Sequence, residues 1–83
     1  MSTVLFAVPA RVHLLDVAGP AQAFSTAVDE GADYELAYVG EQAVVASHQR
    51  LPLHVSVDWP ALTPTDTIVV PGCRVGSGLV VAR

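Results

Sequence analysis

The sequence predicts a small α/β domain built on a parallel β-sheet. Residues 3–8, 34–39 and 67–70 are short apolar runs, and the first is apolar on both alternating faces, as strands buried in a parallel sheet are. Residues 20–29 place apolar side chains at helical spacing, which predicts an amphipathic helix. Strand, helix and strand in this order predict a right-handed βαβ unit. We expect the first and third strands to lie side by side.

The boundaries of the elements follow from glycine and proline. Pro20 suits the first turn of a helix and Gly31 suits its end, so the helix is expected over residues 20–29, after a loop that contains Asp16. Residues 43–47 predict a short further strand. The alternation of Leu51, Leu53 and Val55 predicts an edge strand or arm, and Gly76, Ser77 and Gly78 predict a hinge or turn.

The composition excludes several classes of protein. The chain has 83 residues, of which 52% are hydrophobic, and this length is enough for one small domain and too short for two. No apolar run approaches the roughly 18 residues of a membrane span, and the N-terminus lacks the basic region of a signal peptide. We therefore expect a cytoplasmic protein with no membrane partner.

The charged and metal-binding residues exclude further functions. The net charge is −4 and the four basic residues are scattered arginines, so this piece predicts no nucleic-acid surface. A single cysteine excludes an internal disulfide, and the three histidines lack the spacing of metal ligands. We expect no metal and no cofactor.

The sheet is expected to need more cover than this chain offers. Strands that are apolar on both faces require helices on both faces, and only one clear helix is present. The apolar tail at residues 79–83 has no partner element either. We expect the remainder of a larger domain beyond Arg83, or a homo-oligomer in which a second copy covers the sheet.

Asp16 is the leading candidate for a functional residue. It is the one charge in an apolar turn, and ligands of α/β proteins bind beyond the carboxyl ends of parallel strands. Its apolar neighbours should draw the carboxylate toward a low dielectric, where helix N–H groups or a ligand would have to compensate it. A capping role and a site role both remain open. The aspartates expected to be satisfied by solvent are Asp29, Asp33, Asp58 and Asp66.

Other candidates lie near the same predicted edge. Arg11 and His13 share the loop of Asp16 and are expected at a pocket rim. Cys73 follows the third strand, but no nucleophile elbow or neighbouring histidine accompanies it, which favours a packed thiol. Trp59 is interpreted as a packing residue over an exposed sheet edge.

Two motifs carry a resemblance to a known family. Residues 14–20 read Leu-Leu-Asp-Val-Ala-Gly-Pro, and residues 66–72 read Asp-Thr-Ile-Val-Val-Pro-Gly. Together they resemble the opening half of the ThiJ/PfpI branch of the class I glutamine-amidotransferase-like superfamily. The resemblance implies a flavodoxin-like parallel sheet sandwiched by helices, with Asp16 at the family's acidic position and a nucleophilic cysteine beyond Arg83. Cys73 replaces the second glycine of the family's usual Pro-Gly-Gly.

The form of the first motif resembles two groups within that branch. One is the ligand-sensing and dimerisation domain of AraC/XylS-type transcription regulators, whose DNA contact is made by a C-terminal domain. The other is the isocyanide-hydratase-like enzymes, in which the aspartate acts beside the cysteine. A catalytically silent dimerisation module is a third interpretation. The regulator is favoured because the sequence has no nucleophile elbow. We then expect a small-molecule site at Asp16, Gly72 and Cys73, with Arg11 and His13 from the loop of Asp16 at its rim.

Overall fold

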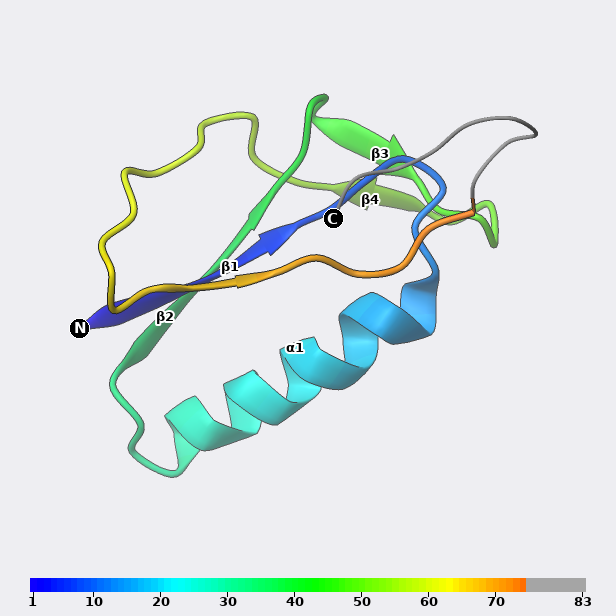
Figure 1. Ribbon diagram of the computed structural model, residues 1–83. Coiled ribbons are helices and arrows are strands. Elements are labelled where there is room, and N and C mark those ends of the chain that lie inside the picture. The colour runs from blue at the N-terminus through cyan, green and yellow to red at the C-terminus, as the bar shows by residue number, and fades with distance from the viewer. Residues whose placement is uncertain (75–83) are drawn as a thin grey trace.

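The computed structural model describes residues 1–74 as a three-stranded parallel sheet, one helix and a separate two-stranded hairpin (Figure 1). The elements in chain order are β1 (Ser2–Ala7), α1 (Leu14–Asp29), β2 (Tyr34–Val39), β3 (Val44–Ala46), β4 (Pro52–His54) and β5 (Thr67–Val69). The turn predicted at residues 76–78 and the apolar tail at residues 79–83 lie outside the described residues.

The parallel sheet confirms the predicted arrangement of strands. Its order is β2-β1-β5, with β1 in the centre, so the first and last strands are neighbours. Val4 is in register with Leu36 of β2 and with Thr67 of β5. Because β1 is flanked on both sides, its central residues are almost completely buried.

One face of the sheet packs against α1. Phe6 lies at the centre of this contact, with its ring edge-on to Phe24 of α1 at 6.3 Å and stacked on Tyr38 of β2 at 4.9 Å. Val4 and Val8 flank Phe6 on the same face and belong to the same core cluster. The apolar side of α1 and the apolar side of β1 therefore form one core, as the helical spacing predicts.

The other face of the sheet is only partly covered. Leu5 points to this face and is fully buried, whereas its neighbour Ile68 on β5 is 54% exposed. Val70, two residues further along, is also exposed. In residues 1–74, α1 is the single helix, and it covers the face that carries Phe6. β5 thus presents apolar side chains to the surface.

The helix begins six residues earlier than the sequence predicts. α1 starts at Leu14, so Asp16 lies in its first turn and Pro20 lies inside it. A distant contact meets this start, because Oε1 of Gln49 accepts a hydrogen bond from the backbone N–H of Leu14 at 3.0 Å. His13, at the N-cap, makes no side-chain capping bond itself. The β3–β4 turn therefore satisfies a helix N–H that has no partner within α1.

The helix ends as predicted, at Asp29, and Gly31 follows the C-cap residue Glu30. This glycine has a φ of 104°, a left-handed conformation that side chains disfavour. The N–H of Gly31 donates to the carbonyl of Val28, and the N–H of Ala32 donates to the carbonyl of Ala27. These two bonds form a Schellman motif, which satisfies the last carbonyl groups of α1.

The two short predicted strands pair with each other rather than with the main sheet. β3 and β4 are antiparallel, with Val45 opposite Leu53. The hairpin packs against the end of β2 at Gly40, which is buried and has no room for a side chain. A Cβ there would lie 2.9 Å from a methyl group of Val45 and 2.9 Å from one of Val55. Gly40 thus lets the hairpin approach the sheet closely.

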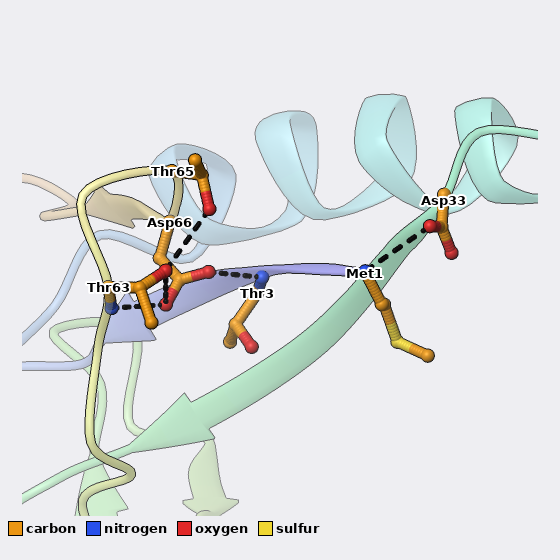
Figure 2. Close-up of polar contacts among 6 residues, drawn as sticks. All are labelled: Met1, Thr3, Asp33, Thr63, Thr65 and Asp66. Carbon is orange, nitrogen blue, oxygen red and sulfur yellow. Dashed lines mark hydrogen bonds and ion pairs between the residues drawn. The ribbon is translucent and has the colours of Figure 1, made fainter.

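Two aspartates hold the amino-terminal end of β1 (Figure 2). The carboxylate of Asp66 accepts hydrogen bonds from the backbone N–H of Thr3 at 2.8 Å and that of Thr63 at 2.7 Å. These donors, Thr3 above all, favour the charged carboxylate and lower the pKa of Asp66 from its ordinary value. The expectation that solvent satisfies Asp66 was wrong, because its side chain links β1 to the loop before β5. Asp33 pairs with the N-terminal ammonium group at 3.4 Å.

Candidate functional site

The loop after β1 and the loop after β5 are joined at the carboxyl ends of the strands. The N–H of His13 donates to the carbonyl of Gly72, and the N–H of Arg74 donates to the carbonyl of Arg11, both at 2.9 Å. Between them, Val12 and Cys73 form an antiparallel bridge. The expectation that these two loops meet at one end of the sheet is confirmed, and the reason is the adjacency of β1 and β5.

Asp16 lies directly against the second of these loops. A Cβ placed on residue 72 would be 2.6 Å from Oδ2 of Asp16 and 3.8 Å from Cδ2 of His13. Only glycine leaves room for the carboxylate in this position. The glycine at position 72 therefore allows the Asp16 carboxylate to lie close to the backbone of this loop.

The environment of Asp16 differs from the one predicted. The side chain is exposed, and its neighbour Leu15 is 80% exposed, so burial of the flanking residues does not draw the carboxylate into a low dielectric. Asp16 does not cap the helix either, because the N-cap is His13 and no side chain of residues 13–16 forms a capping bond. The carboxylate instead lies in the first turn of α1, where the helix dipole favours a negative charge.

A third segment reaches the same place from the hairpin. The N–H of His48 donates to the carbonyl of Val12 at 2.9 Å, and the rings of His13 and His48 meet edge to face with centroids 5.4 Å apart. Gln49 binds Leu14, as described above. Sequence reasoning missed His48 and Gln49, because no local pattern relates a turn to a helix start 35 residues away.

Arg11 and Cys73 occupy the outer part of the site. Arg11 is exposed and has a φ of 62°, which is uncommon for a residue with a side chain. Its N–H donates to the carbonyl of Ala46 at 2.7 Å, so the hairpin also holds this conformation. Cys73 is a free, half-buried thiol, and its backbone forms the bridge with Val12.

A cavity of about 480 Å³ lies at the same edge of the sheet, on the side of the hairpin. Its walls come from the chain after all three parallel strands, from β3 and from Trp59, and Cys73 is the one predicted site residue that lines it. The lining residues are Ala7, Val8, Pro9, Ala10, Gly40, Glu41, Gln42, Val44, Val45, Ala46, Trp59, Val70, Pro71 and Cys73. Asp16 and the cavity are thus two separate features on either side of the β5 loop.

Residues 1–74 lack two further kinds of feature. They contain no group of three or more histidine, cysteine, aspartate or glutamate side chains placed to hold a metal ion. They also contain no helix that is long and apolar enough to span a membrane; α1 is the one helix in this part of the chain.

Comparisons with known proteins leave the family open. No model of a known protein family matches the chain, and no curated protein is significantly similar to it in sequence.

Proposed function

We propose that this chain is the ligand-sensing part of an AraC/XylS-type transcription regulator and binds a small polar molecule at Asp16. The observation that carries the proposal is the exposed Asp16 carboxylate lying against Gly72, on two loops that hydrogen bonds join together. In this sheet β2 lies on one side of β1 and β5 lies on the other, so the order of the strands reverses at β1. Ligands of open α/β sheets bind at such a reversal of strand order.

The chemistry of the site supports a ligand that donates hydrogen bonds. A charged carboxylate only accepts them, and the N–H groups of His13 and Arg74 are already used between the loops. A small molecule with an amine or amide group would therefore suit Asp16. A net charge of −4 also agrees with a piece that leaves DNA contact to another domain.

Signalling would use the joined loops. A ligand that contacts Asp16 and the backbone near Gly72 binds more tightly to the conformation in which the two loops stay together. It shifts the equilibrium toward that conformation, and a distant domain that senses the loops would respond.

The enzyme alternative rests on the same carboxylate. An isocyanide-hydratase-like protein would use Asp16 beside a cysteine outside this sequence, and the exposure of the Asp16 carboxylate also suits a substrate. The two functions differ in what a ligand undergoes. A regulator returns its ligand unchanged, whereas an enzyme consumes it.

Asp16→Asn is the direct test. Thermal unfolding of the protein is measured with a panel of polar amino acids, small amides and small aliphatic amines, none of which carries an aromatic ring, and bound ligand is then recovered and identified. At a tenfold excess over its dissociation constant a ligand stabilises by about 1.4 kcal/mol, which raises Tm by roughly 6–11 °C. Asp16→Asn should abolish this rise, whereas the loss of the favourable charge in the first turn of α1 should lower the unliganded Tm by only a few degrees.

Asp29→Asn is the matched control, because Asp29 is an exposed aspartate at the far end of the same helix. It should keep the full response. A ligand-dependent rise that survives in Asp16→Asn would refute the proposed site, and recovery of a converted product would favour the enzyme. A protein that responds to no ligand of the panel would fit a silent dimerisation module.

A further inference from the structure

We propose that the cavity beside the hairpin binds a small aromatic amine, independently of Asp16. The cavity lies at the carboxyl ends of β1, β2 and β5, and its walls are mainly aliphatic. Its volume of about 480 Å³ falls within the range of small-molecule sites. The proposal goes beyond the proposed function, since Asp16 does not line this cavity.

The walls favour a planar apolar group. Val44 and Val70 expose 45% of their surface each, and both line the cavity. Trp59 lies at its rim with 54% of its surface exposed. An aromatic ring placed here would cover the two valines and could pack against the indole. Contact between two aromatic rings stabilises a complex by more than the buried apolar area alone.

The charges favour a cation over an anion. Among the lining residues of the described part of the chain, residues 1–74, Glu41 is the one charged side chain, and it forms no ion pair with another of these residues. The face of the Trp59 indole also attracts cations. An ammonium group attached to the ring would therefore meet a carboxylate and an electron-rich ring, whereas a carboxylate on the ligand would meet repulsion.

The single tryptophan makes the test direct. Because Trp59 is the only tryptophan of the chain, its fluorescence reports on the cavity rim alone. Titration with 2-phenylethylamine should give a saturable change with a dissociation constant on the order of 1 mM, as expected for a ligand of this size. The charge-reversed analogue 3-phenylpropionate should bind about fivefold to tenfold more weakly.

Two glutamate variants identify the source of the charge preference. Glu41→Gln should reduce the difference between the two ligands to about twofold. Glu35→Gln should leave the difference unchanged, because Glu35 is an exposed glutamate of β2 that does not line the cavity. Absence of a saturable change, or an equal preference in wild type and Glu41→Gln, would overturn the proposal.

Asp16→Asn separates this site from the proposed regulatory site. It should leave the response of Trp59 to 2-phenylethylamine unchanged, since the carboxylate lies across the β5 loop from the cavity. Loss of the response in Asp16→Asn would place the amine at Asp16 and would refute the cavity as its site. Failure of Asp16→Asn to affect a polar ligand would refute the proposed function and leave this proposal standing.

Discussion

The same substitution, glycine to alanine, should have opposite effects at Gly40 and Gly72. At Gly40 the new methyl group would meet valine methyls at 2.9 Å and the backbone oxygen of Val8 at 3.3 Å. The side chain of Val45 cannot move freely because it is only 5% exposed. The backbone of Val8 is fixed as well, because its N–H donates a hydrogen bond to the carbonyl of Val39. At Gly72 the close atom is Oδ2 of Asp16, at the end of an exposed side chain that can rotate away.

These surroundings set the expected free energies. Overpacking a core costs about 1–3 kcal/mol, and replacing glycine returns about 0.4–1 kcal/mol by restricting the unfolded chain. Gly40→Ala should therefore lower the free energy of unfolding by roughly 1–2 kcal/mol and Tm by roughly 4–16 °C. Gly72→Ala should change stability by less than about 0.5 kcal/mol, as surface substitutions do. It should nevertheless abolish the ligand response, since it displaces the Asp16 carboxylate.

Urea unfolding followed by circular dichroism gives the two stabilities, and the thermal-shift panel gives the two ligand responses. Gly40→Ala, once folded, should keep the response, and Gly72→Ala should lose it. Equal destabilisation by both substitutions would refute the reasoning on the close contacts. A full ligand response in Gly72→Ala would show that the position of Asp16 against residue 72 is unimportant.

Two further perturbations test the hydrogen bonds of Asp66 with Thr3 and Thr63 and the hydrogen bond of Gln49 at the start of α1. Stability should fall as the pH drops through and below the ordinary pKa of aspartate, because the folded state lowers the pKa of Asp66 and the unfolded state then binds protons more readily. Asp66→Asn should flatten this part of a plot of urea midpoint against pH, and an unchanged slope would refute the role of the Thr3 and Thr63 bonds. Gln49→Ala should lower the free energy of unfolding by about 0.5–1 kcal/mol through loss of the bond to Leu14, whereas Gln22→Ala, on the exposed side of α1, should not. Equal loss in both variants of this pair would argue against capping of α1 by the hairpin.

The parallel sheet and the end of the helix could be predicted from the sequence because their causes are local. Apolar residues on both faces of residues 3–8 require burial on both faces, which predicts a strand of a parallel sheet, and the structure places it between β2 and β5. Gly31 ends the helix because a left-handed residue is needed there and glycine adopts that conformation without strain. The meeting of Asp16 with the loop at Gly72 followed from the same reasoning, since parallel neighbours bring their carboxyl ends together.

The start of the helix and the exposure of Asp16 were decided by tertiary contacts. Proline at position 20 is locally well suited to a first turn, yet α1 begins at Leu14, where Gln49 of the β3–β4 turn accepts a hydrogen bond from the backbone N–H. Sequence distance hides such a contact, because a side chain that caps a helix from another element leaves no periodic or spacing signal. The packing of the β3–β4 hairpin against Gly40 and the cavity beside Trp59 have the same origin. Each is formed by segments whose own sequences are compatible with several partners, and only the packing of the whole chain selects one.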